Sequence, residues 1–161
     1  MKRPLIVLTL MLSAVLADTA LAADPALSIQ EPYVRLAPPN APATGAFMVI
    51  KNSGNDDRKL VKAESPVSKI VELHNHINEN GVMKMRKVPS IDVKAHGEAI
   101  LKPGSYHVML IEMNQPLTEG QTVPITLGFD DGSTLEVTAA VRKLQMTMPT
   151  TPAMKHGETK H

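Results

Sequence analysis

The sequence contains no cysteine and no tryptophan, and only two tyrosines and two phenylalanines. The lack of cysteine excludes disulfide bonds, thiolate metal sites, cysteine nucleophiles and the Cys-ligated blue-copper centre. The chain also lacks a strong charge of either sign, because its formal net charge is +1 at pH 7 and its charged residues are scattered. Nucleic acid and anionic lipid are therefore not expected as main partners.

Long apolar runs are equally scarce, and one run stands out, Leu5–Leu16, which follows a cationic pair at residues 2–3. It is about 12 residues long, whereas a helix that spans a bilayer needs about 20. The run precedes Ala20-Leu21-Ala22, a small-x-small pattern typical of signal-peptidase sites. We therefore expect residues 1–22 to be a signal peptide that is cleaved before Ala23 on export to the periplasm, with no membrane insertion of the mature chain.

The mature chain alternates β-rich segments with turn residues, and no window shows a helical period over three turns. This pattern predicts an all-β Greek-key sandwich or barrel at residues 23–142, followed by a flexible Met/His-rich tail at residues 143–161. Strands are expected at 28–37 (interrupted at Pro32), 44–52, 58–64, 69–77, 82–88, 99–102, 106–113, 122–129 and 134–141.

What the chain has in plenty is methionine, with ten residues, alongside six histidines. Residues two apart on a strand point to the same side, so the strand segments predict three face-sharing pairs. The Asn-Gly step at 80–81 predicts a hairpin that places two of these pairs on neighbouring strands. The pairs are His74 with His76, Met83 with Met85, and His107 with Met109.

Thioether sulfur is a soft neutral ligand and imidazole is intermediate, so a convergent His/Met set favours Cu(I) over Mg²⁺, Ca²⁺ or Mn²⁺. Zinc takes Cys, His or carboxylate ligands instead. A different interpretation is that methionine fills an aromatic-poor core and that the histidines are surface or hydrogen-bonded residues. The residues alone leave both interpretations open.

The segment VELHNHINENGVMKMRKV and the later LKPGSYHVMLIEMNQPLTEGQTVPITLGFDDG resemble the periplasmic copper chaperones of the PCu(A)C type. The family motif of His, ten residues, Met, twenty-one residues, His, one residue, Met falls on His74, Met85, His107 and Met109. The resemblance extends over roughly residues 27–142 and implies a cupredoxin-like sandwich that binds one Cu(I) through these four side chains.

Several charged or soft side chains near the motif fall outside it. His76 and Met83 share strand faces with the expected ligands and are predicted to be outer neighbours or exposed residues. Glu72 and Glu112 are predicted to face solvent, and no Ser-His-Asp grouping or carboxylate pair stands out near the motif.

The tail holds a second collection of soft and imidazole ligands. One interpretation is a flexible arm that captures copper, including Cu(II), or that shields the main site. The other is a solvated tail with incidental residues. The candidate ligands in the tail are Met146, Met148, Met154, His156 and His161.

The resemblance implies a metallochaperone rather than an enzyme, which delivers copper by ligand exchange towards cytochrome c oxidase assembly. The receiving partner would be the oxidase copper site or an assembly factor. Two alternative functions remain open. One is a copper-storage or detoxification protein that uses the tail, and the other is a structural sandwich in which methionine fills the core. A redox enzyme is disfavoured because a Cys-free His/Met site strongly prefers Cu(I).

Overall fold

The computed structural model describes residues 24–143, which form ten strands and no helix. No segment in that range is a helix long and apolar enough to cross a membrane. The signal peptide expected at residues 1–22 and the tail ligands Met146, Met148, Met154, His156 and His161 lie outside the described residues. The strands are β1 (Leu27–Arg35), β2 (Ala43–Asn52), β3 (Arg58–Glu64), β4 (Ser68–Glu79), β5 (Val82–Lys87), β6 (Ile91–Val93), β7 (Gly97–Leu101), β8 (His107–Met113), β9 (Thr122–Phe129) and β10 (Thr134–Arg142).

Each strand expected from the sequence is present, with ends that differ by a few residues, and two local features differ. β6 was not expected, because three residues are too short to show an alternating pattern. Pro32 does not interrupt β1. The strand instead carries an irregularity between Gln30 and Tyr33, where its register to β2 shifts and Glu31 adopts a φ of 49°. A bulge removes one residue from the ladder and thereby accommodates a proline without ending the strand.

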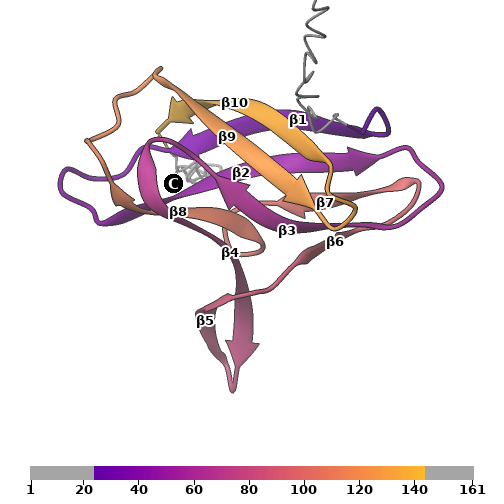
Figure 1. Ribbon diagram of the computed structural model, residues 1–161. Coiled ribbons are helices and arrows are strands. Elements are labelled where there is room, and N and C mark those ends of the chain that lie inside the picture. The colour runs from indigo at the N-terminus through magenta and orange to yellow at the C-terminus, as the bar shows by residue number, and fades with distance from the viewer. Residues whose placement is uncertain (1–23, 144–161) are drawn as a thin grey trace, which may run out of the picture.

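The strands follow the order β5-β4-β8-β2-β1-β10-β9-β3-β6, with β7 also paired to β2. All pairings are antiparallel except β1 with β10, which joins the two halves in parallel. The sheet folds over on itself, so that β3 touches β4 and β6 touches β7. No backbone ladder pairs β3 with β4 or β6 with β7, so the sheet is not closed into a barrel. This non-sequential order is that of the expected Greek-key sandwich (Figure 1).

The core lies between the folded halves of the sheet and is almost entirely aliphatic. Alternate residues of each strand point inward, as in β9, where Val123, Ile125 and Leu127 are fully buried. Met48 is the one methionine among the largest fully buried side chains of residues 24–143. Methionine is therefore not the main filler of the core.

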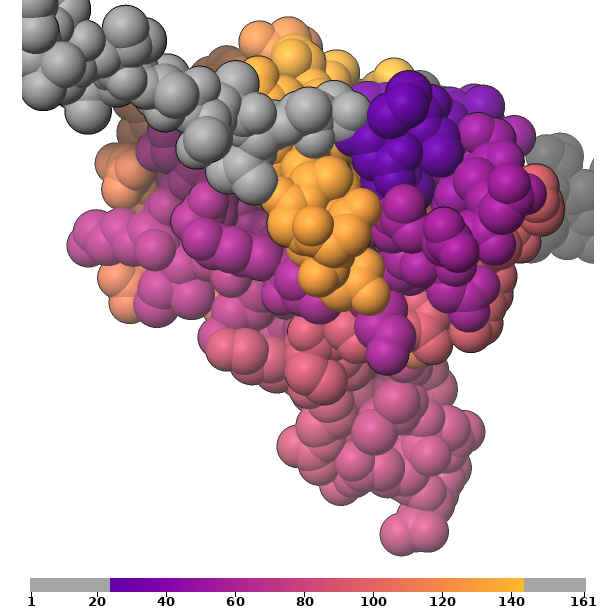
Figure 2. Space-filling model, turned by 45° about the vertical axis from the view of Figure 1, so that its right-hand side comes forward, coloured from indigo at the N-terminus to yellow at the C-terminus, as the bar shows by residue number. Residues whose placement is uncertain are grey.

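The β4–β5 hairpin projects from the body of the sandwich (Figures 1 and 2). Its loop is the two-residue step Asn80-Gly81, with φ of 55° and 82°, and Glu79 pairs with Val82 across it. Positive φ at both positions is the type I′ geometry that Asn-Gly favours, so this predicted turn is confirmed. The turn fixes the register, and the register places Met85 opposite His76.

Candidate metal site

The histidines and methionines of the motif lie on one face of the sheet formed by β5, β4, β8 and β2. His74 is directly opposite His107, and Met109 lies between Glu72 on β4 and Gly45 on β2. Directly opposed residues point to the same side of a sheet. The register alone therefore gathers the motif residues on one face, and not in separate regions of the molecule.

A pocket of about 430 Å³ opens on this face, and its lining includes His76, Met85, His107 and Met109. The side chain of Met85 is 41% exposed, whereas His107 is only 3% exposed, so the pocket runs from solvent to the edge of the core. Its remaining walls are mainly apolar and include Phe47 and Pro38. Within residues 24–143, no group of three or more His, Asp or Glu side chains is arranged to hold an ion. An ion held here would thus need the thioethers.

His107 is held in the state that a metal ligand requires. Its Nδ1 lies 2.9 Å from the carbonyl oxygen of Ser105, which can only accept a hydrogen bond. Nδ1–H must therefore be the donor, and the lone pair of the neutral ring is on Nε2. Burial lowers the pKa of His107, with a further lowering from His76 and His74, so the ring stays neutral where a free histidine would begin to protonate.

His74 is positioned by a carboxylate. Its Nε2 lies 2.8 Å from Oε2 of Glu72, whose other oxygen accepts a hydrogen bond from the ammonium of Lys87 at 2.8 Å. Hydrogen bonds from His74 and Lys87 hold the pKa of Glu72 below its usual value, so this carboxylate is ionised and only accepts. Nε2–H of His74 is therefore the donor. The lone pair of its neutral form is on Nδ1, a buried atom that has no hydrogen-bond partner among residues 24–143.

The residues beside the motif differ in part from the expectations based on the sequence. Glu72 does not simply face solvent, because its carboxylate accepts a hydrogen bond from His74 and fixes the orientation of that ring. His76 lines the pocket and His74 does not. Met83 lies opposite Asn78 near the tip of the hairpin, is 54% exposed, and is not among the residues that line the pocket.

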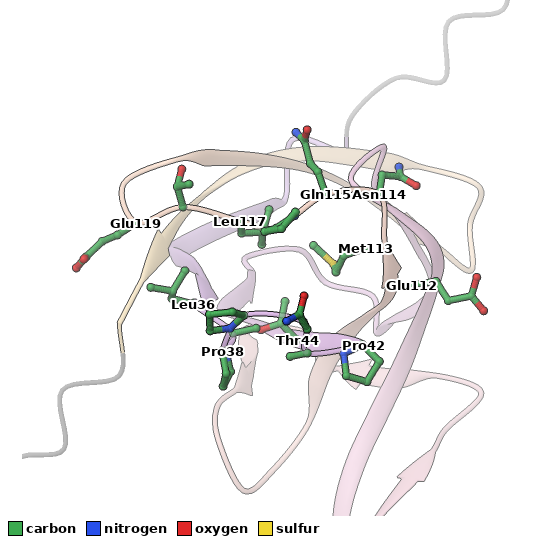
Figure 3. A pocket seen from close by; sticks show the side chains of 16 residues that line it. Leu36, Pro38, Pro42, Thr44, Glu112, Met113, Asn114, Gln115, Leu117 and Glu119 are labelled. Carbon is green, nitrogen blue, oxygen red and sulfur yellow. The ribbon is translucent and has the colours of Figure 1, made fainter.

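Glu112 lies at the far end of β8 and forms an ion pair with Lys69 at 3.5 Å, where both side chains are largely exposed. It also lines a second pocket of about 680 Å³ at the end of the sandwich (Figure 3). That pocket is lined by prolines and apolar side chains such as Leu36 and Leu117, and Met113 is its one His or Met residue. It lacks the ligands that a soft ion needs.

Comparison of the sequence with protein families matches residues 27–141 to the family described as "Putative lipoprotein LpqE-like". The chain is 35% identical over 100 residues to "Putative lipoprotein Lxx21020" of Leifsonia xyli subsp. xyli, a match that covers 62% of this chain. It is also 31% identical over 124 residues to the uncharacterized protein RP573 of Rickettsia prowazekii, which covers 72% of this chain. The match spans 60% and 66% of these relatives' own lengths.

Solved structures with the same fold include the copper-bound PCuAC domain from PmoF2. That domain has a TM-score of 0.64 at 20% identity, and the match covers 76% of this chain and 97% of the domain. The solution structure of CuI-DR1885 from Deinococcus radiodurans is more similar in sequence, with 34% identity, a TM-score of 0.62, and coverage of 76% of this chain and 81% of that one. The expected all-β, cupredoxin-like fold is thus confirmed.

Proposed function

Because this chain belongs to the LpqE-like family and has the fold of PCuAC domains, we propose that it binds one Cu(I) on the β5–β4–β8 face and passes it to a partner by ligand exchange. The ligands in this proposal are His74, Met85, His107 and Met109. The observation that carries it is their placement on one face, where Met85, His107 and Met109 line a pocket open to solvent. Two structures similar to this chain are described as copper-bound or Cu(I)-bound.

The donor chemistry favours a carrier over an enzyme. Thioethers and neutral imidazoles hold Cu(I) without loss of a proton, so no general base is needed for binding or release. Met85 comes from an exposed strand and can leave the ion without disturbing the core, whereas His107 is buried and fixed. A partner that offers its own soft ligands would therefore approach from the side of β5 and displace Met85 first.

We further propose that residues 1–22 direct export, so that the copper is handled outside the cytoplasm. The names of the LpqE-like family and of the Leifsonia relative, both putative lipoproteins, support an exported protein. A Cys-free site suits an oxidising compartment, because thiol pairs there tend to form disulfides. Delivery towards cytochrome c oxidase assembly is the recipient pathway that we infer from the PCu(A)C resemblance.

The test replaces the two thioethers by leucine, which keeps their volume and removes their sulfur. His107 is less suitable for truncation, because it is buried and its loss would leave a cavity. We expect the Met85→Leu/Met109→Leu variant to lose stoichiometric Cu(I) binding in anaerobic competition with a chromogenic Cu(I) chelator. Met83→Leu, two residues away on the same face of β5, should bind like the wild type. Retention of one tightly bound Cu(I) by the double variant would overturn the site assignment.

A further inference from the structure

β4 presents two imidazoles to the metal-binding face, and the sequence motif accounts for only one of them. His74 and His76 are two residues apart and point to the same side of the strand. Their rings are about equally close to the ring of His107, with centroid separations of 5.8 Å and 5.2 Å respectively. Proximity to the buried histidine therefore does not favour His74 over His76.

The contacts of the two rings differ. The Nε2 of His74 hydrogen-bonds Glu72, and Glu72 also pairs with Lys87 opposite His74 on β5. His76 forms no hydrogen bond to another residue among those described, and it lies directly across from Met85. It is His76, together with Met85, His107 and Met109, that lines the pocket.

Both β4 histidines also carry a buried Nδ1 atom that has no hydrogen-bond partner within the described part of the chain. An unsatisfied buried polar atom costs about 1–3 kcal/mol, and such atoms are rare in folded proteins. In the tautomer that Glu72 imposes, Nδ1 of His74 carries a lone pair, and Nδ1 of His76 carries one in one of the two neutral tautomers. A soft metal ion between the strands would satisfy such a lone pair on either ring.

We propose that His76 is a copper ligand that alternates with His74. The face then holds two overlapping sets of two imidazoles and two thioethers, which share Met85, His107 and Met109. Glu72 acts as a positioning residue, because its hydrogen bond restrains His74 and leaves His76 as the imidazole that meets copper in the pocket. This inference rests on the proposed function and adds a ligand to the same site.

A spare imidazole beside the ion has a direct consequence for transfer. If one imidazole dissociates before a partner's ligand has bound, the other can occupy the vacated position, so the ion remains four-coordinate until the partner's ligand replaces a donor. Each exchange step then substitutes one donor for another of the same kind. Neither a proton acceptor nor a redox change is required.

The experiment compares Cu(I) affinity in the full-length chain for His74→Ala, His76→Ala and the double variant, by anaerobic chelator competition. Mutation of residues that only support a metal ligand usually changes affinity about 10–100-fold, so loss of a ligand with a substitute nearby should cost at least about tenfold. We expect each single variant to keep one Cu(I) with affinity lowered about tenfold or more. The double variant should lose far more than either. Asn75→Ala, on the opposite face of β4, is the matched control and should not change the affinity.

A second measurement does not depend on any variant folding. The nitrogen NMR resonances of all imidazoles in the wild-type protein are recorded before and after one equivalent of Cu(I). Alternation predicts that Nδ1 of His76 shifts on loading. The Glu72→Gln variant, which weakens the restraint on His74, should make the shift of His74 larger and that of His76 smaller.

The inference is overturned if His76→Ala binds within twofold of the wild type, if the double variant equals His74→Ala alone, or if the His76 resonances do not move. A wild-type protein that fails to bind Cu(I) would instead overturn the proposed function itself. Binding that depends on the thioethers but not on His76 would leave the proposed function intact and remove only this ligand.

Discussion

Gly45 on β2 leaves the space that the ring of Phe47 occupies beside the proposed metal-binding residues. It pairs with Met109, and the ring of Phe47 from the same strand lies over it, so that a Cβ at residue 45 would be 2.9 Å from Cζ of that ring. Phe47 is itself enclosed, with ring centroids 5.2 Å from Tyr33 and 6.0 Å from His107. The glycine is thus needed for space, because it lets an aromatic ring support the buried histidine.

Gly45→Ala should therefore disturb both stability and the site. The ring of Phe47 must move against Tyr33 or His107, and overpacking of this kind costs about 1–3 kcal/mol in the free energy of unfolding. We expect a loss in that range in urea denaturation, accompanied by weaker Cu(I) binding because His107 is displaced.

The matched control is Gly128→Ala on β9, where the nearest atom to a new Cβ is Cβ of Lys62 at 3.4 Å, an ordinary contact. A glycine-to-alanine change without strain is near neutral or slightly stabilising. If Gly45→Ala were as stable as Gly128→Ala, Phe47 would not be the tightly held support described above.

Among the elements, β5 is the least secured. It is the end strand of the order, it pairs with β4 alone, and each of its residues is exposed. Edge strands with few buried contacts open locally at low free-energy cost. Met85, the proposed ligand on this strand, would link β5 through copper to His107 and Met109 on β8.

Copper should therefore slow amide hydrogen exchange in β5. At free Cu(I) of about 100 times Kd, any opening that releases the ion is suppressed about 100-fold, so the β5 amides that bond to β4 should exchange more slowly by about that factor. The turn at residues 130–133 opens without disturbing the face and serves as the internal control. Equal slowing in the turn and in β5, or no slowing in β5, would contradict a ligand on this strand.

Some features of these strands could be predicted from the sequence and others could not. Asn80-Gly81 specifies a two-residue turn, so the pairing of β4 with β5 and the shared face of the motif residues were predictable. The difference in surroundings between His74 and His76 was not, because both have the same strand parity. It depends on Glu72 and Lys87, which the register of β4 with β5 brings together across the sheet. β6 could not be predicted, because three residues are too few to show an alternation of apolar and polar side chains.

For the whole molecule, Cu(I) must stabilise the folded state if the face binds it. An ion that binds only the folded chain, present at about 100 times its Kd, adds about 2.7 kcal/mol to the free energy of unfolding. For a domain of this size that is an increase in Tm of about 5–15 °C. A structural sandwich without a copper site would show no such increase, and neither should the Met85→Leu/Met109→Leu variant.

The same melting experiment separates delivery from storage when it is run as a titration. A carrier with one site should reach its full Tm increase close to one equivalent of Cu(I), because the ligands in β4, β5 and β8 then hold a single ion. A storage protein would bind several further ions, and calorimetric stoichiometry on the full-length chain would count them. Saturation at several equivalents would contradict the single-ion carrier, since the pocket is lined by His76, Met85, His107 and Met109, four donors that suit one ion.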